Sequence, residues 1–121
     1  MKKLSVLLLL LLTVSFSSMA CDITLKVENE KSSYSVGDEI VVKITIVLIH
    51  RDCAVSIKNT QLTPVNVKIL QGTDWKEKTK GTWERKLKLK VLETTQKEAT
   101  LTVLRTCVRE GGKAVIKFKL K

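Results

Sequence analysis

The chain has 121 residues and a formal net charge of +10, with 22 lysine or arginine residues against 12 aspartate or glutamate residues. Lysine is a hydrated point charge that recognises phosphate and bases poorly, and only 4% of the residues are aromatic, so few rings are present for base stacking. The composition therefore argues against nucleic-acid binding and favours solubility or loose attraction to anionic surfaces.

Residues 1–20 have the pattern of a bacterial secretion signal. Two lysines follow the initiating methionine, and the apolar run at 4–14 is shorter than the roughly 20 residues of a membrane-spanning helix. A small side chain at Ala20 predicts cleavage after that residue, which leaves residues 21–121 as one domain. We therefore expect an exported protein of the periplasm or cell envelope. Without the two leader lysines, 20 basic residues face 12 acidic ones, a net charge of +8.

Alternation of apolar and polar side chains runs through almost all of residues 21–121 and predicts about seven strands. The expected strands are residues 23–27, 40–49, 53–57, 65–69, 83–91, 101–107 and 114–120. The strand at 40–49 is apolar on both faces, which predicts a central position covered on both sides. Trp83 shares a face with Leu87 and Leu89 and is expected in the core.

The connections carry turn-forming and polar residues. Residues 59–64 are expected to break the chain, 71–81 to form a polar loop, and 110–113 to form a hairpin turn. No helix is expected beyond a single turn at 75–80. Trp75 lies in the polar loop, and it either folds back onto the end of the domain or is exposed as a contact anchor.

Seven short strands in about 100 residues predict an all-β, two-sheet antiparallel sandwich. The segment Tyr34-Ser-Val-Gly-Asp-Glu-Ile-Val-Val-Lys-Ile44 resembles the passage between the first two strands of bacterial immunoglobulin-like and fibronectin-III-like domains. The resemblance implies an immunoglobulin-like arrangement of the strands. Trp83 departs from the pattern of antibody domains, because it falls on the fifth strand rather than the third.

The cysteines Cys21, Cys53 and Cys107 permit three single-bridge pairings. Export places them in an oxidising compartment, and Cys53 and Cys107 both adjoin strongly patterned segments. We therefore predict a Cys53–Cys107 disulfide, worth about 4 kcal/mol from the entropy of loop closure. Cys21 would then be a lipid attachment site or a free thiol. The lipoprotein motif is incomplete, because Ser18 stands where leucine is usual.

The predicted sandwich brings three loops to one pole. The third and sixth strands would be antiparallel neighbours, so the start of one lies beside the end of the other. This pole would hold the candidate binding residues, which are His50, Arg51, Trp75, Lys76, Lys78 and Arg109.

Neither a metal site nor a catalytic site is expected. His50 is the only histidine, and a Cys53–Cys107 bridge would remove the two thiols that could complete a metal site with it. No nucleophile is evident beside it, and no C-x-x-C spacing indicates a redox site. We therefore expect a non-enzymatic protein without a cofactor.

The expected function is that of an envelope binding or accessory module that contacts a partner protein or an anionic surface, such as an acidic glycan or lipid head groups, through this pole. A membrane would be reached only through a lipid on Cys21. The lysine rows at 86, 88 and 90 and at 117, 119 and 121 indicate either polyanion binding or protection of strand edges. The alternatives are a thiol-based redox or metal-handling periplasmic protein, and a purely structural, lipid-tethered domain.

Overall fold

The computed structural model describes residues 21–48, 56–106 and 111–121. Several sequence predictions lie outside these described residues. They concern the leader, His50, Arg51, Arg109 and the Cys53–Cys107 bridge.

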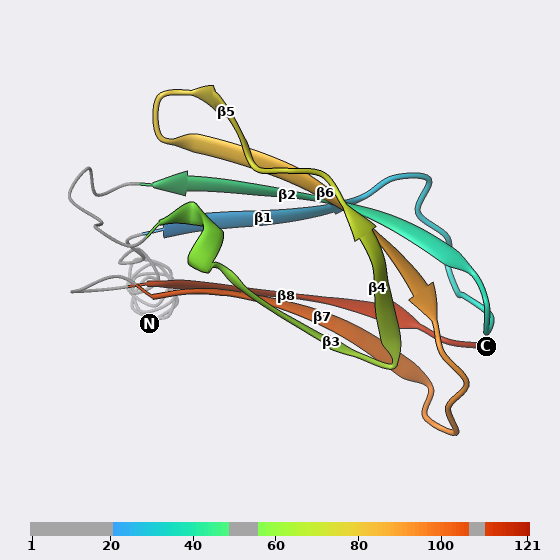
Figure 1. Cartoon of the computed structure of the whole chain (residues 1–121). Helices are drawn as coiled ribbons and strands as arrows, with labels where there is room; N and C mark the ends of the chain where they lie inside the picture. The colour runs from blue at the N-terminus through green and yellow to red at the C-terminus, as the bar shows by residue number, and fades with distance from the viewer. Residues whose placement is uncertain (1–20, 49–55, 107–110) are drawn as a thin grey trace, which may run out of the picture.

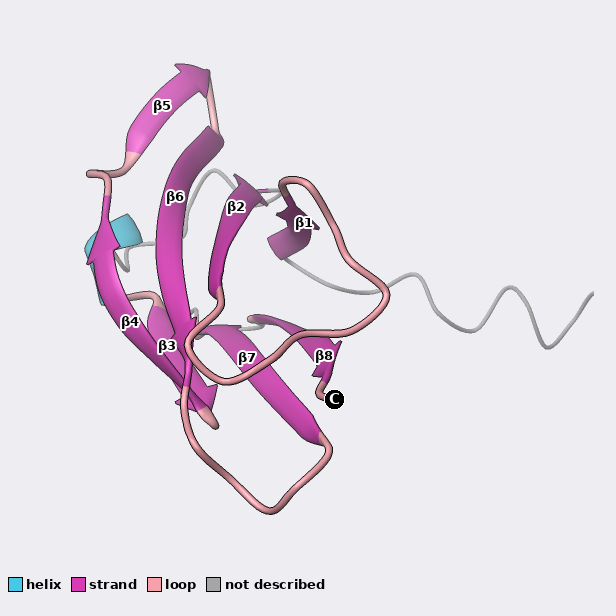
Figure 2. Cartoon of the chain, turned by 90° about the vertical axis from the view of Figure 1, so that its right-hand side faces the viewer, coloured by secondary structure: helices cyan, strands magenta, loops and turns pink. Residues whose placement is uncertain are grey.

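Two antiparallel sheets pack against each other in the described part of the chain (Figures 1 and 2). The larger sheet has the order β1-β2-β6-β4, and β5 also pairs with β6. Its strands are β1 (Cys21–Val27), β2 (Glu39–Leu48), β4 (Val67–Gly72), β5 (Lys76–Thr79) and β6 (Thr82–Val91). The smaller sheet has the order β3-β7-β8. Its strands are β3 (Gln61–Val65), β7 (Glu98–Arg105) and β8 (Gly112–Lys119).

The predicted all-β sandwich is confirmed, and the described residues form eight strands in place of about seven. A constant-type immunoglobulin sandwich has seven strands in two sheets. One sheet contains the first, second, fifth and fourth strands in that order, and the other contains the third, sixth and seventh. Counted without β5, the present strands have this order. The short β5 is an addition that forms a hairpin with the start of β6.

The core lies between the two sheets, where alternate residues of each strand point inward. Apolar side chains that are at most 2% exposed include Ile40, Val42, Ile44 and Ile46 of β2, Leu87, Leu89 and Val91 of β6, and Leu101 and Val103 of β7. Each such side chain contributes roughly 1.5–3 kcal/mol by leaving water. The central position predicted for β2 is confirmed, but the expected cover on both faces is wrong. Val47 on the outer face is 36% exposed, because that face of the antiparallel sheet meets solvent.

The chain between Ser56 and Gly72 differs most from the prediction. The segment expected as the end of a strand at 53–57 instead enters a 3-10 helix, η2 (Ile57–Asn59). The predicted break at 59–64 contains strand β3, which accepts Pro64 because β3 lies at the edge of its sheet.

The single strand expected at 65–69 is two strands in different sheets. Asn66, with φ at 61°, turns the chain from β3 into β4. Val65 is consequently 46% exposed and Val67 only 3%. The single helical turn considered at 75–80 does not form, because Lys76–Thr79 are strand β5 and pair with β6.

Candidate functional site

One end of the sandwich holds the described segments that are nearest in sequence to the predicted pole, whereas His50, Arg51 and Arg109 lie outside the described residues. β3 and β7 are antiparallel neighbours, with Gln61 opposite Leu104. The backbone N–H of Leu48, at the end of β2, donates a 2.8 Å hydrogen bond to the carbonyl of Gly81 in the β5–β6 turn. Figure 1 shows the end of β2, the turn between β5 and β6, and the start of β8 at this same end.

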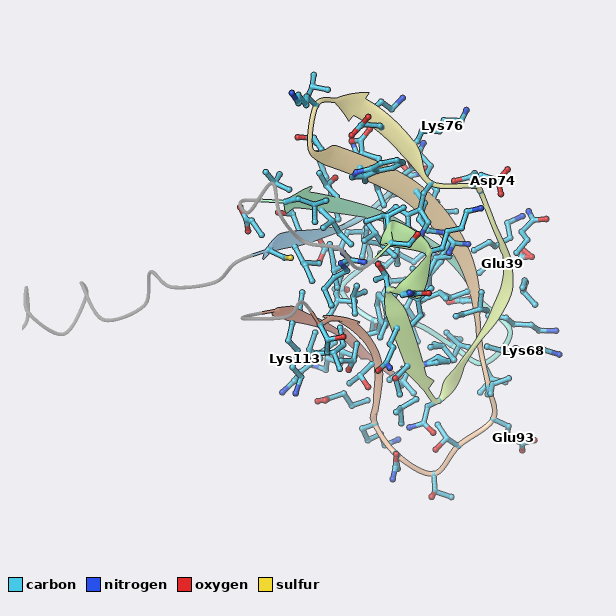
Figure 3. All side chains as sticks on the ribbon, turned by 60° about the vertical axis from the view of Figure 1, so that its left-hand side comes forward. Glu39, Lys68, Asp74, Lys76, Glu93 and Lys113 are labelled. Carbon is cyan, nitrogen blue, oxygen red and sulfur yellow. The ribbon has the colours of Figure 1, made fainter. Side chains whose placement is uncertain are left out.

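A cleft of about 600 Å³ opens beside this end of the molecule. We call it the tryptophan cleft, because both tryptophans of the chain line it. Its lining residues are Ser56, Ile57, Lys58, Thr73, Asp74, Trp75, Trp83 and Arg85. Figure 3 shows Asp74 and Lys76 where the chain passes from β4 into β5, well apart from Lys113 on β8.

The alternation of β6 places two of the cleft residues. Trp83 and Arg85 have the same parity as the buried Leu87 and Leu89, so they lie on the inward face of the strand. A side chain at Gly72 of β4 would collide with the guanidinium of Arg85, so glycine leaves room for it. The 3-10 helix η2 contributes a further wall of the cleft.

Trp75 folds back onto the domain, which is the first of the two alternatives that the sequence left open. Its side chain is half-buried and packs against the hydrophobic core. The guanidinium carbon of Arg85 lies 5.5 Å from the centre of the Trp75 ring, which is within the range of a cation–π contact worth about 0.5–2 kcal/mol. The cleft therefore offers indole surface next to a fixed positive charge.

The two candidate lysines near Trp75 do not join it in the cleft. Lys76 pairs with Glu84, whose side chain lies on the outer face of β6. The Nζ of Lys78 lies 4.0 Å from the same carboxylate. Both lysines are exposed and line a hollow on the outer face of the larger sheet. Lys76 and Lys78 thus line a different hollow from Trp75, although Thr73 and Arg85 line both.

Arg85 is the functional candidate that the sequence analysis missed. It is a charged residue at an inward-facing position of a strand, between Trp83 and Leu87. A charge at a position where the alternation predicts an apolar residue was the signal in the sequence that could have identified it. Its Nε atom is buried and has no hydrogen-bond partner in the described part of the chain. The position is thus unusual for a charged side chain, which is normally solvated or fully paired.

Cys21, the predicted lipid attachment site or spare thiol, is 1% exposed at the start of β1 and pairs with Leu48. A diacylglyceryl group needs more room than this buried side chain has, so lipidation would require the start of β1 to leave the sheet. Within residues 21–48, 56–106 and 111–121, no cluster of three or more metal-ligating side chains and no membrane-spanning helix occurs.

Comparison with protein-family models, with curated proteins and with solved structures gives no match for this chain.

Proposed function

We propose that residues 21–121 form an exported, non-enzymatic binding module of the bacterial cell envelope, related to immunoglobulin-like domains, and that the tryptophan cleft is where it contacts a partner protein. The observation that carries this proposal is the placement of Arg85 over the ring of Trp75 in an open cleft. Tryptophan and arginine are the residues most enriched among the energetic hot spots of protein interfaces.

The chemistry of the cleft indicates what part of a partner it would accept. Trp75 and Trp83 offer apolar surface, whereas Arg85 and the exposed Lys58 offer positive charge. Asp74 supplies one acceptor at the rim. This combination suits a protruding segment in which an apolar side chain stands next to a carboxylate.

The test is capture of a partner from an envelope extract of the producing bacterium by the immobilised mature domain. Arg85→Met keeps the unbranched stem of the side chain and removes the charge, and Trp75→Leu removes the ring. Each change should weaken binding of the captured protein by about 2 kcal/mol, roughly thirtyfold in Kd. Lys97→Met is the matched control, because it removes one positive charge from the exposed β6–β7 connection, outside the cleft.

Binding to the cleft has its own optical signal. The chain has two tryptophans and both line the cleft, so a purified partner should change the intrinsic fluorescence of the domain. Equal capture by all four proteins, together with an unchanged emission spectrum, would exclude the tryptophan cleft as the contact site.

A further inference from the structure

The outer face of the larger sheet carries a concentration of lysines. We call it the lysine face and define it by Lys26, Lys43, Lys68, Lys76, Lys78, Lys86, Lys88 and Lys90. The acidic residues on the same face are Asp22, Glu28, Glu39 and Glu84. Eight lysines against four carboxylates leave a net charge of +4 on one side of the domain.

Three of these lysines lie next to one another across three strands. Lys26 of β1 is directly opposite Lys43 of β2, and Lys43 is directly opposite Lys86 of β6. Neighbouring strands are about 4.7–4.9 Å apart, and like charges directly opposite each other destabilise a sheet. Two carboxylates offset part of the repulsion, since Lys43 lies 3.2 Å from Glu84 and Lys86 lies 2.6 Å from Glu28. The row is therefore not explained by the stability of the sheet.

Protection of strand edges explains the lysines of β8 but not those of β6. β8 is at the edge of its sheet, whereas β2 and β6 are internal strands. On the outer face of the smaller sheet, the outward positions of β3 and β7 hold one charged residue, Glu98. The lysines of β2 and β6 thus require another explanation, because internal strands have no free edge to protect.

Two hollows follow the lysine face and share two residues. The first, of about 330 Å³, is lined by Lys43, Thr73, Lys76, Lys78, Glu84, Arg85 and Lys86. The second, of about 350 Å³, is lined by Val41, Gln71, Gly72, Thr73, Lys86, Leu87 and Lys88. Lys86 and Thr73 belong to both, so the hollows form a continuous track beside β6.

We infer that this track binds a linear acidic polysaccharide. A flexible chain can enter recessed hollows that a flat bilayer surface would span without filling. Lysine ammonium groups suit scattered carboxylates, because they act as point charges without the fixed fork of arginine. Glu84, Thr73 and Gln71 add acceptors and donors for sugar hydroxyls. A polymer without hydroxyl groups, such as polyphosphate, would leave these acceptors unused.

The test uses polygalacturonate, which carries a carboxylate on each sugar, as the probe and the mature domain as the protein. Calorimetric titration should show binding that weakens with rising salt, and neutral dextran should not bind. The double variant Lys43→Gln/Lys86→Gln should weaken binding at least tenfold. The control is Lys117→Gln/Lys119→Gln on the edge strand β8, which removes the same charge and should change the affinity less than twofold.

Several outcomes would overturn the inference. Equal weakening by the two double variants would assign binding to net charge alone. Tighter binding of polyphosphate than of polygalacturonate would exclude a polysaccharide track, and binding only to phosphatidylglycerol vesicles would assign the face to a membrane. Thermal unfolding of both double variants serves as the folding control, and removing Lys43 and Lys86 should not lower the transition temperature, because it relieves repulsion.

Discussion

Arg105 on β7 donates a 2.7 Å hydrogen bond from Nη1 to the carbonyl oxygen of Ser56, the residue that caps the 3-10 helix η2. The same nitrogen lies 3.3 Å from the Oγ1 of Thr60, and Arg105 is 1% exposed. A single buried guanidinium thus links the smaller sheet to both ends of η2, which contributes a wall of the tryptophan cleft.

Replacing Arg105 by Met is expected to lower the free energy of unfolding by about 3 kcal/mol. The change removes charge-assisted hydrogen bonds, and the carbonyl of Ser56 loses its buried donor. Urea unfolding measures the effect. Arg85→Met, at a half-buried position, should lower the free energy of unfolding by less than half of this amount. A loss below about 1 kcal/mol for Arg105→Met would show that water or another donor replaces the guanidinium.

Asn66 holds the turn at which the chain changes sheets, with φ at 61°. Its Nδ2 donates hydrogen bonds to the side chain of Gln96 at 2.6 Å and to the carbonyl of Glu98 at 2.9 Å. Asn66→Ala should destabilise by about 2 kcal/mol, because alanine loses these bonds and tolerates a left-handed backbone poorly. Asn66→Gly should cost about half of that, since glycine adopts positive φ without strain. Chemical denaturation of the two variants side by side tests this order, and the reverse order would contradict it.

Tyr34 and Phe118 form an edge-to-face pair with ring centres 5.8 Å apart. The Tyr34 hydroxyl also accepts a 3.0 Å hydrogen bond from the backbone N–H of Lys31. Tyr34→Phe removes only this acceptor and should cost about 1 kcal/mol, whereas Tyr34→Ala leaves a cavity against Phe118 and should cost roughly 3–5 kcal/mol. Thermal unfolding distinguishes them. Similar losses would show that the hydroxyl, rather than the ring pair, stabilises this part of the fold.

The secreted protein is expected to begin at Cys21, as the cleavage pattern predicts, and to carry no lipid, because Cys21 is buried and paired with Leu48 of β2. Intact mass and N-terminal sequencing test both points, and a mass increment equal to a diacylglyceryl group would contradict the second. Non-reducing peptide mapping should yield one linked peptide containing Cys53 and Cys107. Linkage of either cysteine to Cys21 would show that the sequence-based pairing is wrong.

The sequence predicted the strands whose alternation is continuous, which include β1, β2 and β6. It did not predict the change of sheet at Asn66, because Val65, Val67 and Ile69 continue the same alternation of apolar and polar residues on both sides of Asn66. The positive φ of Asn66 depends on hydrogen bonds to residues about 30 positions away, and such contacts leave no local pattern.

The candidate site was predictable only in part. The fold-back of Trp75 was one of the two interpretations that its position in a polar loop left open. The β5 strand was not predicted, since three of its four residues, two lysines and a glutamate, have low strand propensity. It pairs with the part of β6 that extends beyond β4. Arg85 was missed although its parity with Leu87 and Leu89 places it on the inward face, because no local pattern shows that its side chain lies over Trp75.

The carboxyl end of the chain has a practical consequence. The N–H of Lys121 donates to the carbonyl of Tyr34, and Figure 1 shows this terminus at the end of the molecule away from the β5–β6 turn. A biosensor surface that is grafted to a tag after Lys121 would hold the domain upright, with the tryptophan cleft toward the analyte. Random amine coupling would instead modify the lysines of the lysine face, and the immobilised domain would no longer bind an acidic polymer there.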